Sequence, residues 1–207
     1  MDSFYTVVKT ETWEQVIDKS RFIGIVLPVS SIAEVEANLA KVRETYPNAR
    51  HYVYAYRLRE GYLEKSTDDG EPQGTGGRPV LDLLQYRQVW NVLLVVARYF
   101  GGILLGAGGL TRAYGGTARQ VLDKAELTLL VPHIIYGLKV SYSWYETLKY
   151  QFRLHSWETG KEEFGIDVYM EVFIPWEERE QFTKWLNDFT QSQVNWKEVE
   201  VTLRPKS

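Results

Sequence analysis

The sequence contains no cysteine, and this absence excludes disulfide bonds, thiolate zinc sites and a cysteine nucleophile. Long hydrophobic runs are also absent, because the longest apolar stretches, such as Val92–Ala97, are too short to cross a bilayer. The first residues lack the basic and then apolar pattern of a signal peptide. We therefore expect a soluble, cytoplasmic protein of a reducing compartment, with no membrane partner.

Neither sign of charge dominates the chain. Its 207 residues carry a net charge of −3, so the protein as a whole is not a polycation. A role with nucleic acid would have to rest on a local basic surface. The length fits one large domain or two modest ones, each able to close a core.

Hydrophobic patterning in the first half predicts mixed α/β structure. Ser31 and Glu34 have the spacing of a capping box, at the start of a helix that Pro47 ends. In His51–Leu58, tyrosines recur at every second position, which is typical of a strand with two different faces. The expected strands are Phe4–Thr10, Arg21–Val29, His51–Leu58, Val89–Phe100 and Leu127–Val131, and the further helices are Pro79–Tyr86 and Leu110–Glu126.

The second half predicts the order β-α-β-β-α-β, the split βαβ pattern of ferredoxin-like domains. We therefore predict an α+β protein with two domains, residues 1–132 and 133–207, with Pro132 as the boundary. The expected elements are strand Ile134–Ser143, helix Trp144–His155, strands Gly160–Phe164 and Ile166–Pro175, helix Trp176–Thr190 and strand Val194–Leu203.

Glycine is concentrated in one region, since 11 of the 16 glycines lie between Gly70 and Gly116. Glycines supply positive φ in turns, and they also let the backbone approach a ligand, so that successive amides can hold an anion. We favour the ligand interpretation where a buried strand is followed by a helix. The glycines at that junction are Gly101, Gly102, Gly106, Gly108 and Gly109. The segment has neither the Walker ending nor the dinucleotide-binding spacing.

Lysine is missing between Lys65 and Lys124, so every cation there is an arginine. Arginine alone suggests fixed, bidentate contacts to phosphate or carboxylate. We expect Arg87 and Arg119 to pair with nearby acids. Arg98 and Arg112 bracket the glycine segment, and with those glycines they form the predicted anion-binding or nucleic-acid-binding site.

The acidic loop between Ser66 and Gly77 is predicted to form the rim of this site. Adjacent carboxylates in an Asp-Asp-Gly turn favour a structural role over a metal site, and a lone histidine on a strand is more often structural than a general base. We predict no metal and no cofactor, and we find no complete catalytic set. The predicted rim residues are His51, Asp68, Asp69, Gly70, Glu71, Gly74, Thr75 and Arg78.

Four blocks of residues, in order, resemble the signature of the YigZ/IMPACT family. They are Lys19-Ser20-Arg21-Phe22-Ile23, Ala49-x-His51, Asp68-Asp69-Gly70-Glu71-Pro72-x-Gly74-Thr75-x-Gly77-x-Pro79 and Arg98-Tyr99-Phe100-Gly101-Gly102-x-x-Leu105-Gly106. The resemblance implies an N-terminal α/β sandwich similar to the second domain of a small-subunit ribosomal protein. It also implies a C-terminal ferredoxin-like domain similar to the last domain of elongation factor G.

Three hypotheses on function follow. The resemblance implies a role in regulating translation, because eukaryotic members restrain activation of an initiation-factor kinase. With the arginine segment and its aromatic residues, among them Phe100 and Tyr114, it favours a module that binds RNA or ribosome-associated proteins. The alternative is an enzyme that acts on a phosphorylated small molecule at the Arg98–Gly109 junction, with His51 or Asp69 moving protons.

The third and weakest hypothesis is a protein partner on the acidic C-terminal domain. Residues 133–207 carry 9 Lys+Arg and 12 Asp+Glu, whereas residues 1–132 are balanced. Tryptophans of this domain are candidate anchors, although such residues are more often part of the core. The candidates are Trp144, Trp157, Trp176, Trp185 and Trp196. A monomer and a weak dimer both remain open.

Overall fold

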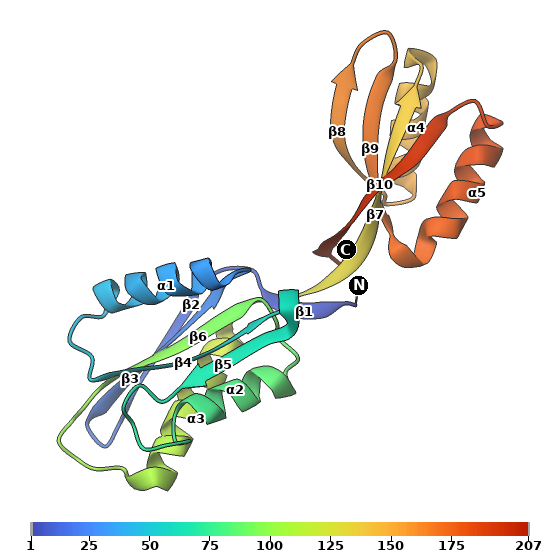
Figure 1. Ribbon diagram of the computed structural model, residues 1–207. Coiled ribbons are helices and arrows are strands. Elements are labelled where there is room, and N and C mark those ends of the chain that lie inside the picture. The colour runs from blue at the N-terminus through green and yellow to red at the C-terminus, as the bar shows by residue number, and fades with distance from the viewer. Residues whose placement is uncertain (1, 207) are drawn as a thin grey trace. The chain divides into compact units, whose positions relative to one another are not determined.

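The computed structural model describes residues 2–206, which form two compact units of mixed α/β structure (Figure 1). One unit spans Phe4–Leu129, and the other contains residues 2–3 and 130–206. Each has its own hydrophobic core, so the chain is an α+β protein of two domains. Along the part of the chain described, no helix combines the length and apolar character needed to cross a membrane.

The first unit is built on an antiparallel sheet with strand order β2-β3-β6-β4-β5. The central strand β6 is the most apolar, and its residues Val92–Ala97 are all 0% exposed. It is buried because helices cover both faces of the sheet. The strands of this unit are β1 (Phe4–Val7), β2 (Glu11–Ile17), β3 (Ser20–Pro28), β4 (His51–Leu58), β5 (Leu63–Thr67) and β6 (Val92–Tyr99).

Helix α1 (Ile32–Thr45) covers one face of this sheet, and α2 (Gly77–Tyr86) and α3 (Gly106–Lys124) cover the other (Figure 1). The capping box is present at the start of α1, because the hydroxyl of Ser31 accepts a hydrogen bond from the Glu34 N–H at 3.2 Å. The Glu34 carboxylate reaches back to the N–H of Ser30, one residue earlier than the pattern predicts.

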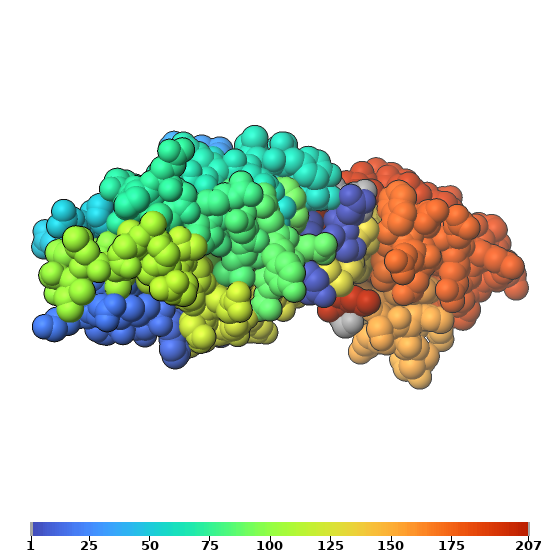
Figure 2. Space-filling model, turned by 90° about the horizontal axis from the view of Figure 1, so that it is seen from below, coloured from blue at the N-terminus to red at the C-terminus, as the bar shows by residue number. Residues whose placement is uncertain are grey.

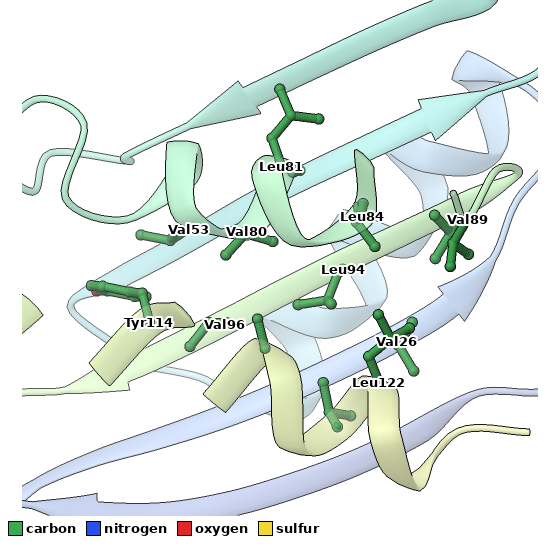
Figure 3. Close-up of a cluster of buried hydrophobic side chains, with 14 of the residues drawn as sticks. Val26, Val53, Val80, Leu81, Leu84, Val89, Leu94, Val96, Tyr114 and Leu122 are labelled. Atoms are coloured by element: carbon green, nitrogen blue, oxygen red, sulfur yellow. The ribbon is translucent and has the colours of Figure 1, made fainter. Parts of the chain in front are cut away.

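The core under α2 and α3 joins residues that lie far apart in the sequence (Figure 3). Val53 of β4 and Val96 of β6 pack with Val80 and Leu84 of α2 and with Tyr114 of α3. All five are 0% exposed. In the space-filling view, the segment around residues 100–110 lies against residues 70–90 (Figure 2). The glycine-rich segments 70–77 and 101–109 are therefore neighbours in space.

The second unit has the predicted β-α-β-β-α-β order and the strand order β10-β7-β9-β8, which is the ferredoxin-like arrangement. Along β9, Val168, Met170, Val172 and Ile174 are buried, as the two-residue period of a strand requires. The elements are β7 (Leu127–Val140), α4 (Tyr142–Leu154), β8 (Glu158–Phe164), β9 (Val168–Pro175), α5 (Arg179–Thr190) and β10 (Asn195–Pro205). Short 3₁₀ turns occupy Glu60–Tyr62 and Trp176–Glu178.

The structure corrects three predictions of local structure. Strands β2 and β5 were not predicted, because both lie at sheet edges and carry mainly exposed or half-exposed side chains. Helix α3 begins at Gly106 and not at Leu110, so three glycines lie in its first turn. Pro132 does not end a strand; β7 continues through it in register with Leu203 of β10. Proline's fixed φ is compatible with extended backbone.

One glycine is required by close packing of two chain segments. A Cβ on Gly101 would lie 2.0 Å from the carbonyl carbon of Lys19, which is backbone and cannot turn away. Gly116, within α3, has its nearest neighbour at 3.9 Å, so a Cβ fits there without displacement.

We expect Gly101→Ala to lower the free energy of unfolding by about 3 kcal/mol or more, because the backbone itself must move. Gly116→Ala is the control, and should raise stability by roughly 0.5–1 kcal/mol through helix propensity. Urea denaturation of both variants measures the difference. Equal midpoints for the two would contradict this packing.

Candidate functional site

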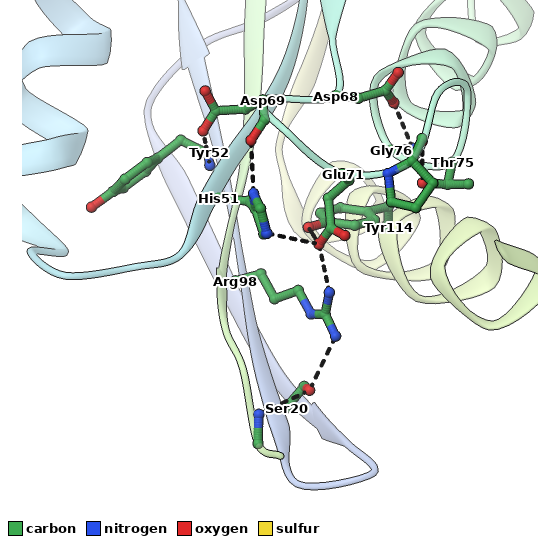
Figure 4. A network of polar contacts seen from close by, with 12 residues as sticks. Ser20, His51, Tyr52, Asp68, Asp69, Glu71, Thr75, Gly76, Arg98 and Tyr114 are labelled. Atoms are coloured by element: carbon green, nitrogen blue, oxygen red, sulfur yellow. Dashed lines mark hydrogen bonds and ion pairs between the residues drawn. The ribbon is translucent and has the colours of Figure 1, made fainter. Parts of the chain in front are cut away.

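Three of the predicted site residues, His51, Glu71 and Arg98, meet at one end of the N-terminal sheet (Figure 4). Arg98 lies near the end of β6, and His51 at the start of β4 is paired with it across the sheet. The loop after β5 brings Glu71 over the same end, and α3 contributes Tyr114. Four segments that are separate in sequence therefore build one polar cluster.

Glu71 is the centre of this cluster. Its Oε1 accepts hydrogen bonds from Arg98 Nη1 at 2.6 Å and from the Tyr114 hydroxyl at 2.7 Å. His51 Nε2 lies 3.8 Å from the same oxygen. The side chains of Glu71 and Arg98 are each only 5% exposed, so this is a buried ion pair. Such a pair holds its geometry because separating the charges leaves each one without solvation.

Arg98 is surrounded by aromatic rings and the Ser20 hydroxyl. Its guanidinium carbon lies 5.4 Å from the ring centroids of both Phe22 and Phe100. Ser20 Oγ accepts from Arg98 Nη2 at 3.5 Å and from the Gly101 N–H at 3.2 Å. Arg98 Nε is the one buried side-chain nitrogen or oxygen without a hydrogen-bond partner in the described part of the chain. Leaving it unpaired costs about 1–3 kcal/mol, which the pairing with Glu71 offsets.

Tyr114 is a permanent hydrogen-bond donor at this site. Burial, and then the hydrogen bond to the Glu71 carboxylate, raise the pKa of Tyr114 far above its ordinary value. The phenol is 0% exposed and therefore stays neutral. It cannot stack on a base, and this corrects the expectation that Tyr114 belongs to an aromatic binding surface. Its function at this site is to fix Glu71.

The backbone of the acidic loop orients His51. His51 Nδ1 lies 2.7 Å from the carbonyl oxygen of Asp69, which can only accept, so Nδ1 carries the proton. The Asp69 carboxylate in turn accepts from the Tyr52 N–H at 2.6 Å. The imidazole is thereby held with Nε2 directed toward Glu71, and in the neutral ring this nitrogen is an acceptor.

Asp68 stabilises the other half of the acidic loop. Its carboxylate accepts from the N–H groups of Gly74, Gly76 and Gly77, each at 2.8 Å. Two of these amides begin α2, so Asp68 caps that helix from outside it. Burial acts to raise the pKa of Asp68, but the three amides together outweigh it, and the net pKa is lowered.

A pocket of about 390 Å³ opens beside this cluster. Its walls combine polar groups of the cluster with apolar residues and the first turn of α3. We call it the Arg98 pocket. It is lined by Arg50, His51, Gly70, Glu71, Pro72, Arg98, Phe100, Leu104, Leu105, Gly106, Ala107 and Leu110.

Some predicted residues lie outside the pocket wall. Arg112 is exposed on α3, and its Nη1 lies 3.5 Å from where a Cβ of Gly108 would stand, so it lies over the first turn. Arg78 pairs with Asp82 at 2.7 Å on α2. Gly102, Gly108, Gly109, Gly74 and Thr75 belong to the neighbouring loops and helix starts, and none of them lines the pocket.

The remaining arginines also differ in their partners. Arg87 pairs with Asp123, which follows it by 36 residues and was not among the nearby acids expected. Arg119 has no carboxylate partner within residues 2–206, contrary to expectation. Arg50 was missed as a site residue. Its position directly before His51 is the sequence signal that could have indicated it.

Within the described residues, no cluster of three or more acidic or histidine side chains has the geometry to hold a metal ion. Polar groups of the site pair with one another, as the contacts of Glu71 with Arg98 and Tyr114 show. Glu71, Arg98 and Tyr114 form a rigid buried unit, while Arg50, Phe100 and the start of α3 face the opening.

We expect Glu71→Ala to lower the free energy of unfolding by about 3–5 kcal/mol, because it leaves the Arg98 charge buried and unpaired. Asp82→Ala breaks an exposed ion pair of the same domain and should change stability by no more than about 0.5 kcal/mol. Urea denaturation compares the two. A loss below about 1 kcal/mol for Glu71→Ala would show that Arg98 is solvated in the folded protein.

Comparison with known families gives two matches. Residues 18–122 match the Impact N-terminal domain, and residues 138–193 match a domain of unknown function (DUF1949). A solved structure described as "Crystal structure of an hypothetical protein" superposes with a TM-score of 0.63 at 30% identity, covering 97% of this chain and 98% of that one.

Several named proteins are similar to this chain in sequence. IMPACT family member YvyE of Bacillus subtilis (strain 168) is 33% identical over 208 residues, covering 100% of this chain and 96% of that protein. IMPACT family member YigZ of Escherichia coli (strain K12) is 31% identical, covering 94% and 97%. Protein IMPACT of Rattus norvegicus is 42% identical over 116 residues, which is 53% of this chain and 36% of that protein. On the domain match and the two whole-length relatives, this chain belongs to the IMPACT family.

Proposed function

We propose that this protein is a binding module for single-stranded RNA, or for an RNA-containing surface of the translation apparatus, and that the Arg98 pocket is where it binds. The observation that carries the proposal is the pocket mouth. There an exposed aromatic ring, an arginine without a carboxylate partner in residues 2–206, and the start of a long helix lie together.

The start of α3 is suited to a phosphate. The helix is 19 residues long, has no acidic side chain in its first turn, and has no side chain capping its first amides. Those amides and the helix dipole attract an anion. Arg112 lies over the same turn and adds a positive charge.

Phe100 provides a surface for a base. Its side chain is 38% exposed, and the guanidinium carbon of Arg50 lies 5.3 Å from its ring centroid. An aromatic face next to an arginine is the arrangement on which unpaired bases stack, and stacking contributes about 1–3 kcal/mol per base. The neighbouring Leu104 is 87% exposed and extends the apolar side of the mouth.

The roles proposed for the arginines differ from those expected from the sequence. Arg98 forms a buried ion pair with Glu71 and packs against the ring of Phe100, so its charge is already neutralised within the fold. Arg50 and Arg112 are the residues proposed to contact phosphates. The family resemblance supports translation as the setting, and this part of the proposal rests on the resemblance alone.

We expect a short single-stranded RNA to bind in fluorescence anisotropy at low salt, and affinity to fall steeply as salt rises. Arg50→Ala combined with Arg112→Ala should weaken binding by about tenfold or more, because two charge-assisted contacts are lost. The slope of log K against log salt should become shallower by about 0.7 for each lost phosphate contact.

The matched control is Arg119→Ala, which removes an exposed arginine of the same helix that does not line the pocket. It should leave the slope nearly unchanged. Binding that is undetectable at low salt, or equally weakened by the control, would refute the proposed site.

One observation favours a second candidate, an enzyme acting on a phosphorylated small molecule. His51 has a defined tautomer, with Nε2 at the pocket wall beside a carboxylate, as a proton-transfer group requires. If this is the function, a phosphorylated metabolite should be consumed in a ³¹P NMR assay, and His51→Ala should abolish turnover without loss of binding. Binding of RNA with no turnover of any phosphate ester would exclude the enzyme.

A further inference from the structure

The two oxygens of the Glu71 carboxylate are used unequally. Oε1 accepts hydrogen bonds from Arg98 and Tyr114, and His51 Nε2 lies 3.8 Å from it, whereas Oε2 has no hydrogen-bond partner among residues 2–206. The Glu71 side chain as a whole is 95% buried. Oε2 itself is not a fully buried atom without a partner, a description that applies only to Arg98 Nε among the described residues. Since Glu71 lines the Arg98 pocket, Oε2 is the oxygen left to meet a ligand there.

His51 adds a second acceptor beside it. Because Nδ1 donates to the Asp69 carbonyl, the neutral ring presents the lone pair of Nε2, 3.8 Å from Glu71 Oε1. The same pocket wall therefore carries two neighbouring hydrogen-bond acceptors. Both are held in place by hydrogen bonds, Glu71 by Arg98 and Tyr114 and His51 by the Asp69 carbonyl, so neither can turn aside to satisfy a mismatched ligand.

The pairing edges of the four RNA bases differ in what they present. Adenine offers one donor next to an acceptor, cytosine one donor followed by acceptors, and uracil one donor between acceptors. Guanine alone presents two adjacent donors, N1–H and the N2 amino group. A wall of two acceptors is complementary to guanine, and it leaves an acceptor facing an acceptor with every other base.

Resting on the function proposed above, we propose that the Arg98 pocket selects an unpaired guanine, whose N1–H and N2 amino group donate to Glu71 Oε2 and His51 Nε2. The base enters between Phe100 and the apolar residues of the α3 start, and its phosphate lies toward Arg50 and the first turn of α3. The pocket volume of about 390 Å³ is large enough for one unpaired base. Glu71 and His51 are specificity-determining residues in this arrangement.

The test changes the ligand first, so that it does not depend on a variant that fails to fold. Nine-residue RNAs consisting of uridine with a single central guanosine, adenosine or inosine are titrated against the unaltered protein by fluorescence anisotropy. We expect the guanosine RNA to bind about tenfold more tightly than the adenosine RNA, since adenine supplies only one donor and leaves one of the two acceptors unsatisfied. Inosine lacks the N2 amino group and should lose about half of that advantage on a logarithmic scale.

The protein is then changed. His51→Ala removes one of the two acceptors and should reduce the preference for guanosine over adenosine to about threefold, because guanine then keeps only the contact to Glu71. His155→Ala, which removes an exposed histidine of the C-terminal unit, is the control and should retain the full preference.

The outcomes separate this inference from the proposed function. Equal affinity for the guanosine, adenosine and inosine RNAs would overturn guanine selection and leave RNA binding intact. Undiminished preference in folded His51→Ala protein would overturn it as well. No binding of any of the three RNAs at low salt would overturn both.

Discussion

The buried contact between Glu71 and Arg98 holds together the end of the N-terminal domain that contains the Arg98 pocket. It joins the acidic loop to the end of the central strand, and through the second bond to Tyr114 it joins both to α3. The pair is almost completely removed from water, so its strength depends on fixed geometry. The ion pair therefore holds the acidic loop after β5 in one position. The pocket exists because these three segments cannot separate independently.

Contacts within the cluster explain why a site rich in charged residues has little unpaired charge. Arg98 is neutralised by Glu71, Asp68 is satisfied by amides of the α2 start, and Asp69 by the amide of Tyr52. What is left at the surface is an arginine, an aromatic ring and uncapped helix amides around a pocket with polar and apolar walls. This combination suits recognition of an anion attached to a flat ring.

Much of the architecture could be predicted from the sequence because it depends on short-range patterns. The two-residue alternation of His51–Leu58, the helix start at Ser31 and the β-α-β-β-α-β order of the second unit are local signals, and the structure has all three. The edge strands β2 and β5 were missed because exposed edges carry little alternation. The start of α3 was placed too late because a glycine-rich first turn resembles a loop in sequence.

The sequence by itself determined which segment is unusual, from its glycines and its arginine-only charge, and it indicated the family. Only the tertiary structure decided what each charged residue does there. Arg98 meets Glu71 across 27 residues, Glu71 meets Tyr114 across 43, and Ser20 meets Gly101 across 81. No local pattern specifies such pairs, because they follow from how the sheet and helices pack. That packing assigned Arg98 to the interior and left Arg50, Phe100 and Glu71 Oε2 at the pocket.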